Sequence, residues 1–325
     1  MNGRLSEMRR CAVIFGAAGQ DAYYLQGHLT LTGYRVIAIG RRGVLTEGMQ
    51  GPFDVLDPAA VLNLIEVERP DEFYYLAAHH HSSHEEQGTL RELFDTSYDI
   101  HCRGLLNVLD AIAAVSPETR LFYAASSLVF GEPPMAPQNE DTPMAPICAY
   151  GITKASGVGL CRLYRRQRGI FCSAGILYNH ESPRRGLRFV TRKIARAAAE
   201  IYRGEQSTLT LGDLDADVDW SFAGDVVRAM HLILQIDTPG DFVVASGTLR
   251  TVREFAARAF AATGLDYRKC VAESPSIIQR ARRSIPLRGD SSRLTAATGW
   301  KAHTSFEELV DMMVRAELSN DGSNA

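Results

Sequence analysis

RCAVIFGAAGQDA, residues 10–22, reads as an apolar strand that runs into a glycine-rich turn and the start of a helix. Glycines in such a turn let the backbone approach a pyrophosphate, whose negative charge the N-terminus of the helix favours. Ala22 stands where the third glycine is usual, and this small side chain still allows close helix packing. The stretch predicts a dinucleotide-binding turn at Gly16 and Gly19.

A second strand, residues 34–39, ends in Gly40-Arg41-Arg42. An acidic residue at this position would bind a ribose 2′-hydroxyl, whereas arginine accommodates a 2′-phosphate. The two arginines therefore favour NADP as the cofactor, with NAD as the alternative.

Strand and helix patterns alternate through the first half of the chain. Residues 73–78 and 121–125 are apolar strand-like runs, and residues 104–112 have helical periodicity. Such alternation predicts an α/β fold, a Rossmann-type doubly wound parallel sheet, with a smaller C-terminal α/β substrate-binding region. Ligands bind beyond the carboxyl ends of the strands in these sheets, so we expect Gly16, Ala78 and Ser126 to line one crevice. We expect residues 1–178 to form the cofactor domain and residues 179–325 to form mainly the substrate region, with some segments interleaved.

Tyr150 and Lys154 are four residues apart in the run AYGITK, which places them on one face of a helix. A neighbouring ammonium favours the phenolate, so we expect a tyrosine pKa below its ordinary value of about 10. Such a phenol can exchange a proton with a sugar oxygen while hydride moves to or from a nicotinamide. The spacing alone is weak, but the cofactor turn makes it a candidate catalytic pair.

Composition excludes several other classes of protein. The 325 residues are 46% hydrophobic and carry a net charge of −3, so no broad basic surface indicates nucleic-acid binding. The chain has no apolar run of about 20 residues and its N-terminus lacks a signal-peptide core. Its six cysteines are scattered without metal-ligand spacing, which is typical of reduced thiols in a cytoplasmic enzyme.

Four histidines, His79, His80, His81 and His84, follow the third predicted strand. They are compatible with a metal site, with lining of the active site or with a solvated loop. We predict no metal, because the spacing brings no matching cysteine or carboxylate ligands. A histidine there could act as acid or base near neutral pH, and Cys148 is a second candidate, although a small buried thiol explains it as well.

The longest distinctive stretches are GILYNHESPRRG at residues 175–186 and FVTRKI at residues 189–194, followed by LGDLDA at 211–216 and Asp219-Trp220. With the cofactor turn, they mark a likeness that covers nearly the whole chain. On these motifs the sequence resembles the extended short-chain dehydrogenases/reductases, also called the NAD-dependent epimerase/dehydratase family. Within that group it is most similar to the GDP-mannose 4,6-dehydratases.

The resemblance implies a GDP-sugar substrate and a homodimer or homotetramer in which the Arg184-Arg185 loop reaches a neighbouring subunit. It places Asp54 and Asp57 in an acidic motif near the adenine. It implies that Ser126, Tyr150 and Lys154 are catalytic and that the cofactor contacts are Gly16, Gly19, Gln20, Asp21, Arg41, Arg42, Asp54, Val55, Leu76, Ala77, Ala78, Tyr150 and Lys154. It also implies that the substrate contacts are Ser127, Leu128, His81, Asn179, Val190, Lys193 and Arg280, the last at a phosphate.

Three positions depart from the family pattern. In the family a glutamate follows the Ser/Thr-Ser pair and serves as acid and base at C5 and C6 of the sugar, but this chain has Leu128. Leu187 replaces a second glutamate, and Val218 replaces an arginine. Ser126, Tyr150 and Lys154 suffice for hydride exchange at C4. The carboxylate that elimination of water requires is absent from this position.

Three hypotheses follow. The first is a 4-ketoreductase, or a 4-epimerase that uses the same half-reaction, acting on a GDP-linked hexose or heptose. The second is a dehydratase in which the histidine segment or Glu85 replaces the lost glutamate. The third is a nucleotide-sugar-binding protein without turnover, which would not need the Tyr150 and Lys154 pair.

Overall fold

A seven-stranded sheet forms the centre of the computed structural model, which describes residues 10–40, 43–44, 53–79, 89–274 and 283–319. Neighbouring strands are parallel except for the last pair, which is antiparallel. The strand order is β10 (Asp241–Val244), β6 (Cys172–Leu177), β5 (Arg120–Ala124), β4 (Glu72–Tyr75), β1 (Cys11–Phe15), β2 (Arg35–Gly40) and β3 (Gly43–Val44).

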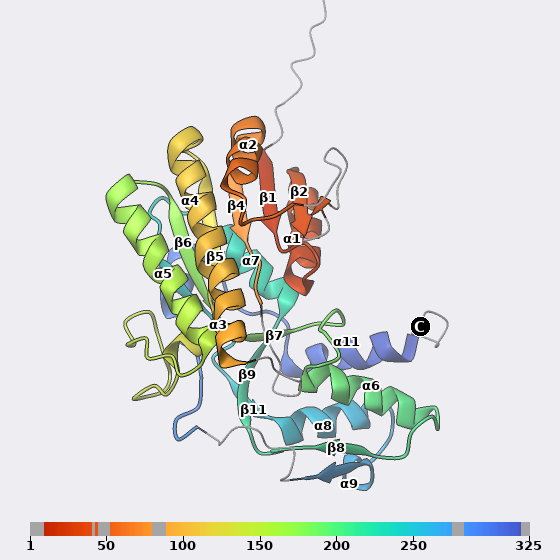
Figure 1. Cartoon of the computed structure of the whole chain (residues 1–325). Helices are drawn as coiled ribbons and strands as arrows, with labels where there is room; N and C mark the ends of the chain where they lie inside the picture. The colour runs from red at the N-terminus through yellow and green to blue at the C-terminus, as the bar shows by residue number, and fades with distance from the viewer. Residues whose placement is uncertain (1–9, 41–42, 45–52, 80–88, 275–282, 320–325) are drawn as a thin grey trace, which may run out of the picture.

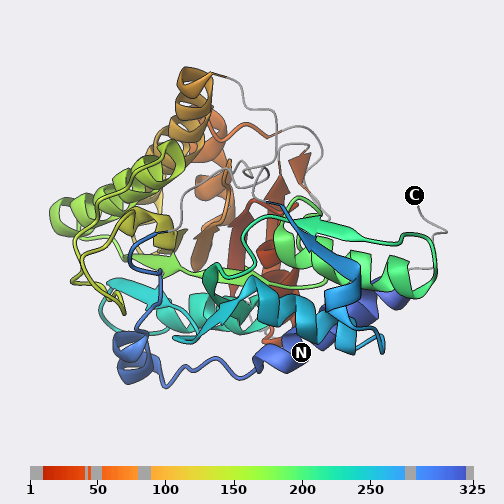
Figure 2. The same cartoon turned by 90° about the horizontal axis from the view of Figure 1, so that it is seen from below.

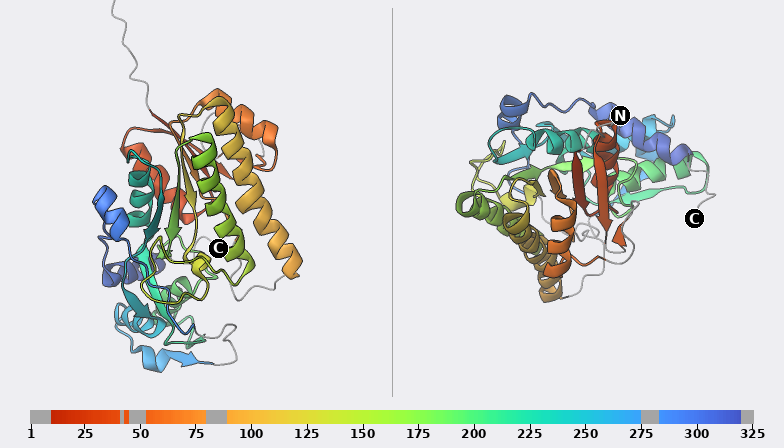
Figure 3. Two further views of the ribbon diagram at one scale, coloured as in Figure 1. Left: turned by 90° about the vertical axis from the view of Figure 1, so that its left-hand side faces the viewer. Right: turned by 90° about the horizontal axis from the view of Figure 1, so that it is seen from above.

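Both faces of this sheet are buried, because successive side chains of a strand point to opposite faces. Val13 and Phe15 of β1 pack into one core, and Ala12 and Ile14 pack into the other. One face is covered by α2 (Pro58–Glu68), α4 (Gly104–Val115) and α5 (Ala149–Arg168), and the other by α1 (Gln20–Leu31), α7 (Ala223–Ile233) and α10 (Ser292–Thr298) (Figures 1 and 3). The predicted doubly wound α/β fold is confirmed.

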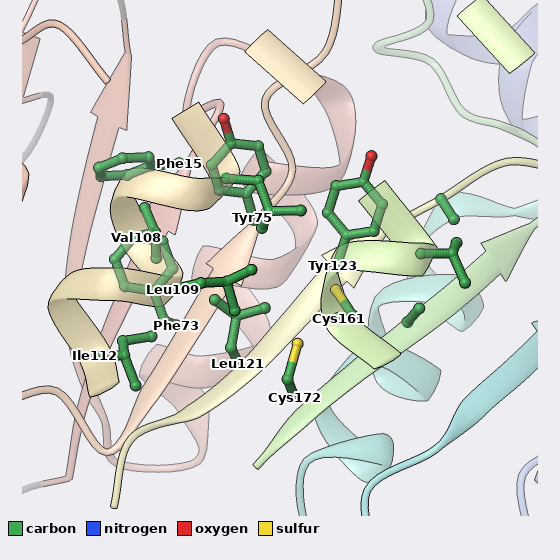
Figure 4. Packing of buried hydrophobic residues seen from close by; sticks show 14 of the residues in the cluster. Phe15, Phe73, Tyr75, Val108, Leu109, Ile112, Leu121, Tyr123, Cys161 and Cys172 are labelled. Carbon is green, nitrogen blue, oxygen red and sulfur yellow. The ribbon is translucent and has the colours of Figure 1, made fainter. Parts of the chain in front are cut away.

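The first core shows why the strand runs are so apolar. In Figure 4, Val108, Leu109 and Ile112 of α4 lie over Phe73 and Leu121, all of them fully buried. Cys161 and Cys172 lie in the same cluster and are free thiols, as are all six cysteines. A strand covered by helices on both faces reads as a continuous hydrophobic run rather than an alternating one.

The predicted strand over residues 73–78 is too long at its end. β4 stops at Tyr75, the last residue that pairs with β5. The Leu76 N–H still donates to Phe15 O, and the chain then leaves the sheet through Ala77 and Ala78. Apolar residues continue past the strand because these residues line a cavity described below, so the hydrophobic pattern could not mark the strand end.

A second region lies at the carboxyl ends of the parallel strands, below the sheet in Figure 1. Its helices α6 (Val190–Tyr202), α8 (Val252–Ala261) and α11 (Phe306–Ser319) enclose a third core and lie together in Figure 2. Two small sheets join them: β11 (Leu249–Thr251), β9 (Asp217–Phe222) and β7 (Asn179–Glu181) form one, and β12 (Val271–Glu273) and β8 (Leu209–Leu211) form the other, with α9 (Tyr267–Cys270) before β12.

The buried carboxylate of Asp219 joins this region to the sheet. It accepts hydrogen bonds from the Ser246 N–H and hydroxyl, the Gly247 N–H and the Gly289 N–H. β10 and α7 come from the second half of the chain yet pack into the first sheet and its covering layer. The division of the chain at residues 178 and 179 stays a prediction.

The remaining elements lie near the end of β4 and the end of β5. α3 (Leu90–Tyr98) runs through the π-helical turn η1 (Asp99–Arg103) into α4, and the 3₁₀ turn η2 (Ser127–Phe130) follows β5. In the described part of the chain, no helix is long and apolar enough to cross a membrane.

Candidate functional site

A cavity of about 1280 Å³ opens at the carboxyl ends of the parallel strands, between the sheet and the second region. The turns after β1, β4 and β5 form one wall, so Gly16, Ala78 and Ser126 line the same space, as the strand order predicts. The opposite wall comes from residues 177–190, 213–219 and 283–287. A cavity of this size can hold a dinucleotide and a second ligand.

Most of the predicted site residues lie in this lining. They are Gly16, Gly19, Gln20, Asp21, Asp54, Val55, Leu76, Ala77, Ala78, Ser126, Ser127, Leu128, Tyr150, Lys154, Asn179 and Val190. Among the described residues that were predicted, Lys193 is outside it and borders a separate hollow of about 240 Å³ with Leu187. The predictions for Arg41, Arg42, His81 and Arg280 lie outside the described residues, as do His80, His84 and Glu85.

The glycine turn after β1 lies directly against the backbone of the chain after β4. Gly16 has φ +100°, and a Cβ on it would lie 2.8 Å from the Ala77 nitrogen, so a larger residue would collide with the chain after β4. The Gly16 N–H donates to Ile39 O at 2.9 Å, and Gly19 caps α1. No described side chain caps α1, and Gly19, Gln20 and Asp21 at its N-terminus line the cavity, which suits a pyrophosphate.

Gln20 and Asp21 bind the protein as well as lining the cavity. The Gln20 amide donates to His180 O at 2.8 Å and accepts from the Ser182 hydroxyl at 2.9 Å. His180 Nε2 lies 3.0 Å from Asp21 Oδ2, while Asp21 Oδ1 is buried with no partner among the described residues. The cofactor turn is therefore bonded to a segment some 160 residues further along the chain.

Asp21 and His180 form an ion pair within the wall. Burial acts to raise the pKa of Asp21, but the His180 cation and its hydrogen bond, together with Arg185 and Gln20, outweigh it and lower the pKa. Burial acts to lower the pKa of His180, but Asp21 outweighs it and raises the pKa. Each charge thus stabilises the other in a desolvated place.

α5 presents Tyr150 and Lys154 to the cavity one turn apart. Cys148 caps the helix, its sulfur accepting from the Gly151 N–H at 3.4 Å. The Lys154 ammonium donates to Ala124 O at 2.7 Å and lies 5.7 Å from the Tyr150 ring centre. Lys154 is 1% exposed, and burial lowers its pKa to about 7.

The expected depression of the tyrosine pKa is wrong in this structure. Burial raises the pKa of Tyr150, the Arg185 cation lowers it by less, and Asp21 and Cys148 raise it further. Desolvation outweighs the favourable charge because the phenol, although partly exposed at the cavity, is surrounded by protein. Tyr150 therefore stays protonated at neutral pH.

The chain after β5 continues the wall that holds the cofactor turn. Ser126 caps η2, and its hydroxyl accepts from the Leu128 N–H at 3.3 Å. Leu128 lines the cavity, and no described lining residue is a glutamate. The carboxylates of the described lining are Asp21, Asp54, Asp99, Asp213, Asp217 and Asp219.

Of the other residues singled out from the sequence, some lie in the cavity lining and one does not. Asp57 is not in the described lining; it caps α2 by accepting from the Ala59 and Ala60 N–H groups. Val218 and His79 line the cavity. No described group of three or more histidine, cysteine or acidic side chains could hold a metal ion.

The arginine loop lies against the protein itself. The Arg184 guanidinium stacks 3.6 Å from the Tyr23 ring centre, and Arg185 pairs with Glu181 at 3.2 Å. Contact of this loop with a neighbouring subunit stays a prediction.

His180 and Arg283 were not among the site residues predicted from the sequence. Arg283 Nε donates to Gly131 O at 3.1 Å, and both side chains line the cavity. His180 adjoins Asn179 in the most distinctive motif, and Arg283 ends the basic run RARR of residues 280–283, so both carried a signal.

Comparison with known proteins adds independent information. The family model for GDP-mannose 4,6 dehydratase matches residues 13–313. GDP-mannose 4,6 dehydratase 2 of Arabidopsis thaliana is 37% identical, covering 96% of this chain and 88% of that protein. The human GDP-mannose 4,6 dehydratase is 32% identical, covering 98% and 94%.

Among solved structures, RMD from Pseudomonas aeruginosa complexed with NADPH shares the fold, with a TM-score of 0.81 and 23% identity over 95% of this chain and 99% of that one. UDP-glucose 4-epimerase from Bifidobacterium longum has a TM-score of 0.80 and 16% identity, covering 95% and 98%. The resemblance predicted from residues 175–194 is confirmed. The chain belongs to the GDP-mannose 4,6-dehydratase family, a group of nucleotide-sugar enzymes within the short-chain dehydrogenases/reductases that use a nicotinamide cofactor.

Proposed function

We propose that this protein transfers hydride at C4 of a GDP-linked hexose or heptose, as an NADP(H)-dependent 4-ketoreductase or as a 4-epimerase using the same half-reaction. One observation carries the proposal. Leu128 lies in the cavity beside Ser126, at the position where the resemblance implies the dehydratase glutamate, and no described lining residue is a glutamate. The proton-transfer group for C4 is retained while the one for C5 and C6 is lost.

The cavity fits a nicotinamide dinucleotide. The turn at Gly16 is a cradle that any Cβ would fill, and the N-terminus of α1 faces the same space. Gly16, Gly19, Asp54, Ala77 and the other lining residues predicted above would hold the cofactor. The preference for NADP rests on Arg41-Arg42, which lie outside the described residues.

The residues of the chain would handle the proton of the reaction. Bound NADPH supplies the hydride. Tyr150 keeps its proton at neutral pH because burial raises its pKa, so it is suited to donate that proton to the oxygen of a C4 ketone. Ser126 would hydrogen-bond the same oxygen, and the Lys154 amine lies 5.7 Å from the Tyr150 ring centre, where its protonated form would offset the phenolate left behind.

Dehydration is the competing function, and its support is the identity of 32–37% to GDP-mannose 4,6 dehydratases over nearly the full chain. It requires an acid/base near C5 and C6. His79 lines the cavity, and the segment to Glu85 lies outside the described residues.

Two incubations separate these functions. The first supplies GDP-mannose and NADP in D2O; we expect no rapid formation of a 4-keto-6-deoxy sugar. The second supplies a GDP-4-keto sugar and NADPH. We expect reduction of the sugar, measured as the loss of NADPH absorbance. A 4-keto-6-deoxy product with deuterium at C5 in the first incubation would establish the dehydratase instead.

A further inference from the structure

The helix that passes beside the catalytic pair contains an irregular turn. α3 and α4 form one run in which residues 99–103 adopt the π-helical turn η1, a rare feature that often accompanies functional sites. The Tyr75 hydroxyl donates to Ile100 O at 2.5 Å, and a Cβ on Gly104 would lie 2.5 Å from that hydroxyl. The absent side chain of Gly104 thus lets the turn press against the end of β4.

The turn directs His101 into the space between β4 and α5. His101 is fully buried, and its ring meets the Tyr150 ring edge-on, with centroids 5.2 Å apart and an interplanar angle of 89°. His101 Nδ1 lies 2.8 Å from Thr153 Oγ1, and the His79 N–H donates to His101 Nε2 at 3.1 Å. One side chain therefore contacts the catalytic tyrosine, its helix and the chain after β4.

These partners define the protonation state of the ring. Thr153 Oγ1 lies 3.0 Å from Ala149 O and 3.1 Å from Tyr150 O, so it gives its single proton to one of these carbonyls and accepts from His101 Nδ1. A backbone N–H can only donate, so His101 Nε2 must carry a lone pair toward His79. The network assigns a neutral imidazole with its proton on Nδ1.

We infer that His101 is a positioning residue that holds two parts of the site in register through its two nitrogens. The Nδ1 bond fixes the turn of α5 that carries Tyr150, and the ring edge holds the phenol. The Nε2 bond fixes residue 79, at the end of a segment whose Ala77 is the close neighbour of Gly16 and whose residues 76–79 line the cavity. The first bond serves proton transfer and the second serves cofactor binding.

The part of this inference that concerns proton transfer rests on the proposed function, whereas the part that concerns cofactor binding does not. Two substitutions separate the nitrogens. His101→Asn keeps a donor near the Nδ1 position but cannot reach residue 79. His101→Gln keeps an acceptor near the Nε2 position but leaves no N–H donor at the Nδ1 position, which faces Thr153. Thr153→Val removes the hydroxyl while it retains the branched shape.

The experiment measures the dissociation constant of the nicotinamide dinucleotide that the wild type binds more tightly, and single-turnover hydride transfer at saturating cofactor. We expect His101→Asn to weaken cofactor binding by about tenfold, the effect of about one hydrogen bond, and His101→Gln and Thr153→Val to leave it within about twofold. We expect His101→Gln and Thr153→Val each to slow hydride transfer by about tenfold, with no further loss in the double variant.

Equal cofactor affinity in His101→Asn and His101→Gln would overturn the inference, as would wild-type hydride transfer in both His101→Gln and Thr153→Val. Melting temperatures of the three variants distinguish a specific effect from a general loss of stability. A general loss would lower cofactor affinity and hydride transfer in all three variants alike. If the wild type binds cofactor but reduces no GDP-4-keto sugar, the proposed function fails while the difference in affinity still tests His101.

Discussion

The Lys154 ammonium donates to Ala124 O at 2.7 Å inside a wall where the side chain is 1% exposed. A carbonyl partner compensates only part of the cost of burying a charge. This explains why burial lowers the pKa of Lys154 to about 7 from 10.5. The Lys154 amine, 5.7 Å from the Tyr150 ring centre, thus has a pKa near neutral pH.

This depressed pKa predicts a stability that depends on pH. Between about pH 7 and 10.5 the unfolded chain holds a proton that the folded chain has released, so stability rises with pH by up to about 1.4 kcal/mol per unit. Below pH 7 the amine is protonated in both states and the slope vanishes. Lys154→Met should remove this rise, as measured by urea unfolding without added nucleotide at pH 7, 8 and 9. Lys301→Met, at an exposed position, is the control; equal slopes in Lys154→Met and wild type would contradict the expectation.

Tyr150→Phe should slow hydride transfer by at least about 100-fold, because a positioned acid contributes 10²–10⁴ in rate. Cofactor affinity should change little. The matched control is Tyr164→Phe on the same helix, whose hydroxyl bonds Asp110 at 2.5 Å and does not line the cavity. Stopped-flow absorbance of NADPH measures the step, and turnover near the wild-type rate in Tyr150→Phe would remove the tyrosine from the mechanism.

Leu128→Glu should restore a carboxylate to the sugar side of the cavity. We expect formation of a 4-keto-6-deoxy sugar from GDP-mannose to increase by about 100-fold or more, since a positioned general acid/base contributes at least that much. Leu187→Glu adds the same charge outside the described lining of the main cavity and should give no increase. Product analysis in D2O reports elimination directly. No gain in Leu128→Glu, with binding of GDP-mannose intact, would show that position 128 does not reach C5 and C6.

Replacing Arg41 and Arg42 together with alanine should erase the preference for NADP(H), with at least about tenfold weaker NADPH binding, because charge-assisted hydrogen bonds contribute about 1.5–3 kcal/mol each. NADH affinity should change little. Arg91→Ala, which removes an exposed arginine on α3, controls for net charge. Calorimetric titration of both dinucleotides measures the ratio, and an unmodified protein that prefers NADH would refute the assignment.

The Asp21 and His180 pair should stabilise the protein only within a limited range of pH. The lowered pKa of Asp21 makes its contribution present above the ordinary aspartate pKa of about 3.9 and lost as pH falls through the folded value. The raised pKa of His180 makes its contribution present below about 6.5 and lost as pH rises through the folded value. A double-mutant cycle of Asp21→Asn and His180→Gln should therefore give a larger coupling energy at pH 5.5 than at pH 9. A coupling independent of pH would mean that a neutral hydrogen bond, not an ion pair, joins them.

Local patterns predicted the turn at Gly16, the doubly wound sheet and the convergence of Gly16, Ala78 and Ser126, because strand-helix alternation determines which chain ends meet. The extent of β4 was not predictable, since cavity-lining residues are as apolar as strand residues. The direction of the Tyr150 pKa was missed because the amount of water excluded depends on packing from residues distant in sequence. His101 had no signal at all: its contacts depend on a π-helical turn, which hydrophobic periodicity does not reveal.

The amide of Gln20 bonds on one side to His180 and on the other to Ser182. These bonds cross-link the cofactor turn to the chain just beyond residue 178, so a hinge motion at the junction between the two predicted domains would have to break them. A movement confined to the opposite wall, at residues 213–217 and 283–287, would leave both bonds intact. Such a movement would widen the substrate side of the cavity while the cofactor turn keeps its contacts with His180 and Ser182.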